Sequence, residues 1–189
     1  MKHNTFYYLA LCVLCLLLAA CGPEQHRFLI GVSQCSDDEW RTQMNKEIRR
    51  EALFYPGVEV DIRSAGDDNR QQTADIEHFI AAGADLIVVA PNEADALAPV
   101  VEKARDKGIP VVLVDRRINS DRYNAYIGAD NYEMGRQIGT YIVSRLKGEG
   151  NVVELTGLQG STPARDRHRG LMDALADLIP AVKPQSAYY

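Results

Sequence analysis

Short apolar runs alternate with longer amphipathic stretches along most of this chain, and this alternation constrains its fold more than any other feature. Strands alternating with helices at a repeat of about 30 residues form βαβ units and a parallel sheet. The strands are nearly all apolar, as in sheets covered by helices on both faces. The sequence therefore predicts an α/β fold with a doubly wound parallel sheet. Strands are expected at 28–32, 58–62, 85–90, 111–114, 125–128 and 151–155, helices at 39–55, 70–82, 95–107, 132–147 and 163–178, and the beginning of another strand at 181–185.

The N-terminus has the pattern of an export signal. One firm positive charge precedes an unbroken apolar run of 15 residues at 6–20. A membrane-spanning helix needs about 20 such residues, so the run suits a signal peptide better than an anchor. It ends Leu-Ala-Ala-Cys at 18–21, which resembles the lipobox of bacterial lipoproteins; the alternative is ordinary signal cleavage with Cys21 merely nearby. We expect a signal peptide at 1–20, a lipid on Cys21, a tether at 21–27 and an exported, periplasmic protein associated with the membrane.

Cysteine content and charge narrow the functional class. Once the signal and the lipidated Cys21 are set aside, Cys35 is the only cysteine left, so no disulfide is possible. We interpret Cys35 as a small buried residue. The mature chain of 169 residues carries 20 basic and 26 acidic side chains, a net charge of −6. Because nucleic-acid binding calls for a basic patch, no nucleic-acid partner is expected. The length allows one domain or two small lobes.

Polar side chains follow the predicted strands, where open α/β sheets bind their ligands. The segment after the first strand lacks a glycine-rich turn and carries three successive acids at 37–39, followed by Trp40. These carboxylates would repel a phosphate, while the dipole of the following helix stabilises them. A neutral polyol fits better, because carboxylates accept its hydroxyl protons, guanidinium groups donate to its oxygens and an indole covers its C–H face. The segments that follow strands are 33–40, 64–69, 91–92, 115–116 and 156–165.

The strand-end residues carry a family resemblance that extends from residue 28 to 189. The matching stretches are Asp-Arg at 115–116, Ile-Gly-Ala-Asp-Asn at 127–131 and Glu-Leu-Thr-Gly-Leu-Gln-Gly-Ser-Thr-Pro-Ala-Arg at 154–165. They resemble the type I periplasmic binding proteins of the ribose- and galactose-binding branch. In that branch the Asp-Arg pair and the arginine opening the later helix hydrogen-bond a sugar. The resemblance therefore assigns contacts with a monosaccharide to Asp115, Arg116 and Arg165.

The first loop departs from that branch in part. The family supplies an amide and two aromatic side chains there, and the corresponding residues are Asp37 for the amide, Glu39 for one aromatic and Trp40 for the other. The resemblance thus adds Asp37 and Trp40 to the expected ligand-binding residues. The replaced positions leave the identity of the sugar open.

The first loop also resembles a narrower group. Gly-Val-Ser-Gln-Cys-Ser-Asp-Asp-Glu-Trp-Arg at 31–41 is similar to the periplasmic sugar-sensing domain at the N-terminus of Bacteroidetes hybrid two-component sensors. Those sensors continue into a membrane helix, a histidine kinase and a DNA-binding output, so the resemblance implies an N-terminal fragment. It implies a first lobe at 28–128 and an incomplete second lobe at 129–189. The lipobox favours the alternative, a substrate-binding lipoprotein of a sugar ABC importer.

Each candidate site residue also has a structural interpretation. Asp37 could cap the following helix, and Trp40 could belong to the core. Asp115 and Arg116 could form a surface salt bridge. The spacing around Arg165 resembles an exposed, arginine-rich helix face.

Enzyme interpretations find little support in the sequence. The chain has no G-x-G-x-x-G after the first strand, no Walker loop and no G-x-S-x-G elbow. Its four histidines form no cluster, and the acids at 37–39 have no further ligand at suitable spacing, so neither a metal nor another cofactor is expected. A receiver domain also carries acids after its first strand, but the export signal argues against it. A lactose-repressor-type regulator would need an N-terminal helix-turn-helix.

Overall fold

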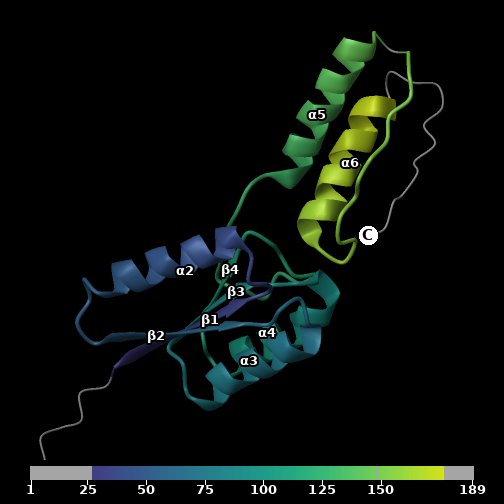
Figure 1. Ribbon diagram of the computed structural model, residues 1–189. Helices are drawn as coiled ribbons and strands as arrows, with labels where there is room; N and C mark the ends of the chain where they lie inside the picture. The colour runs from purple at the N-terminus through teal and green to yellow at the C-terminus, as the bar shows by residue number, and fades with distance from the viewer. Residues whose placement is uncertain (1–26, 148, 177–189) are drawn as a thin grey trace, which may run out of the picture.

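The computed structural model describes residues 27–147 and 149–176, which form a parallel sheet flanked by helices and a further pair of helices (Figure 1). All strand pairs are parallel, and the strand order is β2-β1-β3-β4-β5. The strands are β1 (Phe28–Gln34), β2 (Val58–Ser64), β3 (Leu86–Ala90), β4 (Val111–Val114) and β5 (Ala125–Ile127). The helices are α2 (Glu39–Ala52), α3 (Asn69–Ala81), α4 (Ala94–Asp106), α5 (Asn131–Leu146) and α6 (Thr162–Ala176).

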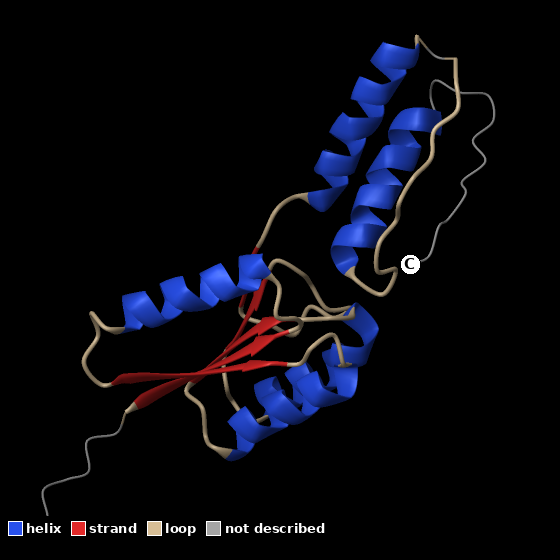
Figure 2. Ribbon diagram, in the orientation of Figure 1, coloured by secondary structure: helices blue, strands red, loops and turns tan. Residues whose placement is uncertain are grey.

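Helices cover both faces of the sheet. Figure 2 shows α2 on one face and α3 with α4 on the other. The strand order explains this arrangement: the chain moves from β1 to one edge, then returns past β1 to build β3, β4 and β5 on the other side. Because such crossovers are right-handed, a reversal of direction puts the helices on opposite faces. The predicted doubly wound α/β fold is confirmed, and its switch point lies between β1 and β3.

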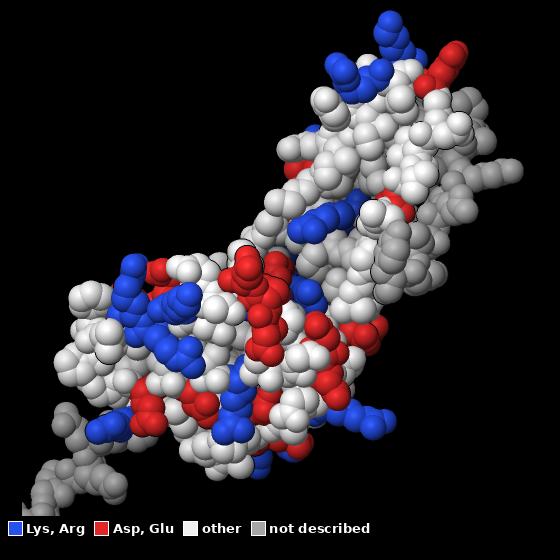
Figure 3. All heavy atoms as spheres, viewed as in Figure 1, with Lys and Arg blue, Asp and Glu red and all other residues white. Residues whose placement is uncertain are grey.

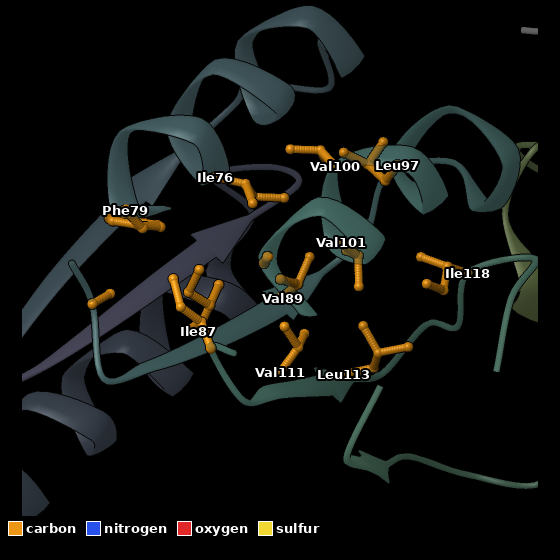
Figure 4. Packing of buried hydrophobic residues seen from close by; sticks show 13 residues of the cluster. Ile76, Phe79, Ile87, Val89, Leu97, Val100, Val101, Val111, Leu113 and Ile118 are labelled. Atoms are coloured by element: carbon orange, nitrogen blue, oxygen red, sulfur yellow. The ribbon is translucent and has the colours of Figure 1, made fainter. Parts of the chain in front are cut away.

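The main hydrophobic core lies between the sheet and helices α3 and α4 (Figure 4). Each large aliphatic or aromatic side chain buried there contributes about 1.5–3 kcal/mol relative to an exposed one. The core therefore holds the strands in place, and with them the strand ends at which the polar loops begin. Its members are Ile76, Phe79, Ala84, Ile87, Val89, Leu97, Val100, Val101, Ala104, Ile109, Val111, Leu113 and Ile118.

Gly31 provides a test of how closely this core is packed. It lies in β1 between Asp61 of β2 and Ile87 of β3, and a Cβ atom there would collide with the Phe79 ring, whose Cδ2 would lie only 2.7 Å away. We expect Gly31→Ala to lower the free energy of unfolding by about 1–3 kcal/mol, measured by urea unfolding followed by circular dichroism. In a Phe79→Leu background the same change should cost less, because the ring is gone. Equal costs in the two backgrounds would contradict the collision.

Helices α5 and α6 lie side by side away from the sheet and meet through small residues (Figure 1). Cβ atoms on Gly135 and Gly170 would collide with the backbone carbonyl oxygens of Arg167 and Tyr132. On Gly139, a Cβ atom would lie 2.6 Å from the Cβ of Ala174. The two helices thus approach backbone to backbone. The position of α6, and of the side chains it carries, is set by its contact with α5.

The segment 151–155 is the clearest departure from the predicted elements. The sequence predicts a strand there, but the structure has only an isolated bridge at Glu154. All five strands of the described sheet come before residue 128, so within the described part of the chain no strand is available to pair along its length. Val153 and Leu155 consequently remain exposed. An apolar run becomes a strand only beside a partner, and the prediction of this strand is wrong for the described structure.

Several remaining predictions concern boundaries. The helix predicted to reach residue 55 ends at Ala52, where shorter bonds from Phe54 N to Glu51 O and from Tyr55 N to Ala52 O close the turn ahead of Pro56. The signal peptide at 1–20, Cys21, the end of the helix at 178 and the strand at 181–185 lie outside the described residues. Across 27–147 and 149–176, no helix combines the length and apolar character needed to cross a membrane.

Candidate functional site

Asp115 stands directly after β4 in a strained backbone conformation. Its φ angle is +65°, in the left-handed region that costs a residue with a side chain roughly 1–2 kcal/mol. Two hydrogen bonds hold it there: the Asp115 N–H donates to the Ile127 carbonyl at 2.8 Å, and the Tyr126 hydroxyl donates to the Asp115 carbonyl at 3.1 Å. Strain retained in this way is typical of residues with a functional role.

A pocket of about 310 Å³ lies between this strand end and the segment that leads into α6. That volume falls in the range of small-molecule sites, roughly 300–1,000 Å³. Figure 3 shows acidic side chains gathered near the junction between the sheet and the α5–α6 pair. Because Asp115 and Arg116 directly follow β4 and line the pocket, the pocket opens at the carboxyl edge of the sheet, where α/β folds bind ligands. It is lined by Asp115 and Arg116 on one side and by Glu154, Leu155, Thr156, Gly157, Leu158, Ser161, Pro163, Ala164 and Arg167 on the other.

The Asp115-Arg116 pair is tied into the fold rather than lying loose on the surface. The Arg116 side chain is only 20% exposed, and its Nη1 donates to the Asn92 carbonyl at 3.0 Å. Asn92, in turn, is buried, and its backbone N–H donates to Gln72 Oε1 at 2.8 Å. The Arg116 Nε lies 3.8 Å from Asp115 Oδ2. A simple surface salt bridge, one interpretation left open by the sequence, does not describe this arrangement.

The structure brings Arg167, and not Arg165, to the pocket. The Arg165 Nη1 lies 3.8 Å from Asp95 Oδ2 at the start of α4, and its side chain does not line the pocket. Arg167 shares a helix face with Pro163 and Gly170, both of them buried. The 3.6-residue period of α6 was the signal that could have separated the two arginines. The structure thus adds Arg167 to the pocket wall, and contact of Arg165 with a ligand stays a prediction.

Asp37 and Trp40 do not line the pocket either. Asp37 is exposed, and the helix cap is Asp38, whose Oδ1 accepts from the Arg41 N–H at 2.9 Å. That hydrogen bond and one from the Ser36 hydroxyl lower the pKa of Asp38. Trp40 is 55% exposed, so its assignment to the core is wrong. Contact of Asp37 and Trp40 with a ligand stays a prediction.

The far wall of the pocket contains polar groups to which the sequence analysis assigned no role. Glu154 is largely buried, and its Oε2 lies 2.7 Å from His168 Nδ1. Thr156 Oγ1 is buried and has no hydrogen-bond partner among the residues that the structure describes. Within the described residues, no three His, Cys, Asp or Glu side chains gather to hold a metal.

Together these features define a class of protein: an α/β domain with a ligand-sized pocket between the carboxyl edge of its sheet and a second body is a cleft-type binding domain. The chain matches the periplasmic binding protein domain over residues 30–188, and it belongs to that family.

Individual relatives support the same membership. The ribose import binding protein RbsB of Bacillus subtilis (strain 168) is 29% identical over 184 residues, covering 90% of this chain and 60% of the relative. The galactofuranose-binding protein YtfQ of Escherichia coli (strain K12) is 34% identical over 164 residues, covering 83% of this chain and 51% of the relative. The chain therefore spans between half and about three-fifths of the length of these two relatives.

A solved structure is more similar still. The fructose binding periplasmic domain of hybrid two component system BT1754 is 59% identical, with a TM-score of 0.80 over 85% of this chain and 53% of that chain. The resemblance predicted from the strand-end residues and the first loop is confirmed. Family membership implies a periplasmic location. As predicted, these relatives are binding proteins and not enzymes.

Proposed function

We propose that this chain recognises a monosaccharide in the pocket between the end of β4 and the start of α6. The observation that carries the proposal is the arrangement, around about 310 Å³, of the Asp115-Arg116 unit on one side and Glu154 and Arg167 on the other. Carboxylate acceptors and guanidinium donors in alternation match the hydroxyl groups of a neutral sugar. Leu155, Leu158 and the other apolar wall residues suit its C–H faces.

Fructose is the first sugar to test. The neighbour whose name contains fructose is 59% identical, whereas the ribose and galactofuranose relatives are 29% and 34% identical. Specificity in such sites depends on a few buried polar groups, so identity across the site residues counts for more than a shared fold.

As its biological role we propose the ligand-sensing input of a transmembrane hybrid two-component histidine kinase. The similarity to a sensor domain and the amino-acid sequence of residues 31–41 support this role. The alternative is a lipoprotein that delivers sugar to an ABC importer, supported by Leu-Ala-Ala-Cys at 18–21. The proposed organisation is a signal at 1–20, lipidated Cys21 in a tether at 21–27, a first lobe at 28–128 and part of a second lobe at 129–189. The gene sequence downstream of codon 189 separates the two roles.

Two proteins test the binding function. The first is residues 22–189, the mature chain without the lipidated Cys21, which is called the mature chain from here on. The second, which we call the completed domain, joins residues 28–176 to the following part of the fructose-binding neighbour, because this chain spans 53% of that protein. Isothermal titration with fructose, ribose and galactose should give a dissociation constant near 1 µM, about −8 kcal/mol, for at least one sugar in the completed domain.

The mature chain alone should bind the same sugar poorly or not at all, since a cleft needs both walls. A completed domain that folds but binds none of the three sugars would contradict the proposed function. Low-micromolar binding by the mature chain would overturn only the expectation that the fragment is insufficient.

A further inference from the structure

Arg41 is a buried cation that neither the motifs nor the pocket accounts for. It lies in the first turn of α2, its side chain is only 5% exposed, and it does not line the pocket. Burying a guanidinium group is costly unless its donors are paired. Its partners therefore indicate what it does.

Three groups from two parts of the chain, the loop after β1 and the end of β4, surround the guanidinium. Its Nη2 donates to Asp115 Oδ2 at 3.0 Å, its Nε donates to the sulfur of buried Cys35 at 3.0 Å, and its Nη1 lies 3.4 Å from Asp38 Oδ2. Strands β1 and β4 are not neighbours, since β3 lies between them. Arg41 consequently reaches from the loop after β1, across the end of β3, to the residue that follows β4.

The electrostatics of this cluster keep Arg41 charged. Burial by itself lowers the pKa of the guanidinium group, but Cys35, Asp115 and Asp38 outweigh this effect, and the pKa is raised. A permanently charged, buried donor with fixed geometry holds a carboxylate more firmly than a flexible surface lysine would.

The contact between Arg41 and Asp115 also determines which oxygen of the Asp115 carboxylate can bind a ligand. Arg41 and Arg116 both approach the same carboxylate oxygen, Oδ2, at 3.0 Å and 3.8 Å. The Asp115 side chain is still 32% exposed and lines the pocket. Oδ2 is thus engaged on the protein side, while none of the described residues donates a hydrogen bond to Oδ1, which leaves that oxygen to accept from a ligand hydroxyl.

We infer that Arg41 is a positioning residue for ligand binding, one that orients the Asp115 carboxylate from behind the pocket and ties it to the cap of α2. The inference deepens the proposed function and rests on it for its effect on affinity. Because the Arg41 guanidinium carbon also lies 5.3 Å from the Trp40 ring centroid, the same side chain connects Asp115 to the exposed indole. A change at Arg41 therefore acts on ligand binding without touching the ligand.

The first experiment needs no sugar. In the mature chain, residues 22–189, the carboxyl-carbon NMR signal of Asp115 is compared between the parent protein and Arg41→Lys. Lysine keeps the charge but loses the fixed fork of donors. We expect the Asp115 signal to move, with the circular dichroism spectrum unchanged. Arg122→Lys serves as the matched control, because Arg122 pairs with Asp106 and Glu102 elsewhere in the same body; it should leave the Asp115 signal in place.

The second experiment is a double-mutant cycle in the completed domain. Arg41→Lys should weaken sugar binding about 10-fold or more, and should weaken it less than threefold when Asp115 is already Asn. A purely structural role predicts lower unfolding stability with unchanged affinity, or equal losses of affinity in both backgrounds, and either result overturns the inference. If no sugar binds the parent protein, the proposed function fails separately, and the Asp115 signal alone decides: movement supports positioning, and an unmoved signal refutes it.

Discussion

Replacing Arg167 with alanine is expected to weaken monosaccharide binding by about 10- to 100-fold, whereas replacing Arg165 should weaken it less than about fivefold. A hydrogen bond to a charged group contributes about 1.5–3 kcal/mol, and a factor of ten in affinity corresponds to about 1.4 kcal/mol. Arg167 lines the pocket opposite Asp115. Arg165 instead makes an exposed ion pair with Asp95, of a kind that contributes about 0–1 kcal/mol. Isothermal titration of the completed domain measures both constants.

The two substitutions control for each other. They remove the same side chain from positions two residues apart on α6, so any general effect on that helix is shared. Unfolding by urea should show similar stabilities for the two variants. A larger loss of affinity for Arg165→Ala than for Arg167→Ala would contradict the site described above and restore the assignment implied by the family resemblance.

Replacing Gly170 with alanine is expected to destabilise the α5–α6 pair by about 2 kcal/mol or more. Helix propensity alone predicts the opposite, since alanine in a helix interior is favoured over glycine by about 0.5–1 kcal/mol. The added Cβ would collide with the Tyr132 carbonyl oxygen and approach the Arg136 nitrogen to 2.8 Å. Both are backbone atoms of α5, so neither can rotate away, and overpacking of this kind costs about 1–3 kcal/mol or more. Urea unfolding of the mature chain measures the change.

Gly139, which lies in the same contact between α5 and α6, allows a matched comparison with Gly170. A Cβ atom there would lie 2.6 Å from the Ala174 side chain, so Gly139→Ala should also destabilise the pair. Adding Ala174→Gly removes that neighbour and should restore part of the loss, although the Leu171 carbonyl at 3.0 Å remains. Stabilisation by Gly170→Ala, or no rescue of Gly139→Ala, would mean that the helices do not pack through these glycines.

The order and type of the elements could be predicted from the sequence because they depend on short-range patterns. Apolar runs such as 85–90 and 111–114 became β3 and β4, and each of the five helices in the described part of the chain begins within one residue of its expected position. The run at 151–155 has the same local pattern and did not become a strand. Its composition was adequate, but a strand needs a neighbour to accept its backbone hydrogen bonds, and that neighbour is not a local property.

Some residues of the candidate site could likewise be located from the sequence, and others could not. Asp115 and Arg116 could be located from the sequence, because a residue that directly follows a buried parallel strand must lie at the carboxyl edge of the sheet. Arg167 required the helix phase of α6 and the packing of that helix on Gly135. Arg41 required the contact between the first turn of α2 and Asp115, 74 positions further along the chain. Sequence periodicity determined the helices and the five strands of the sheet, and with them which loops meet at its carboxyl edge. Only the tertiary structure decided which side chains meet there, because burial and pairing of charges depend on residues far apart in the chain.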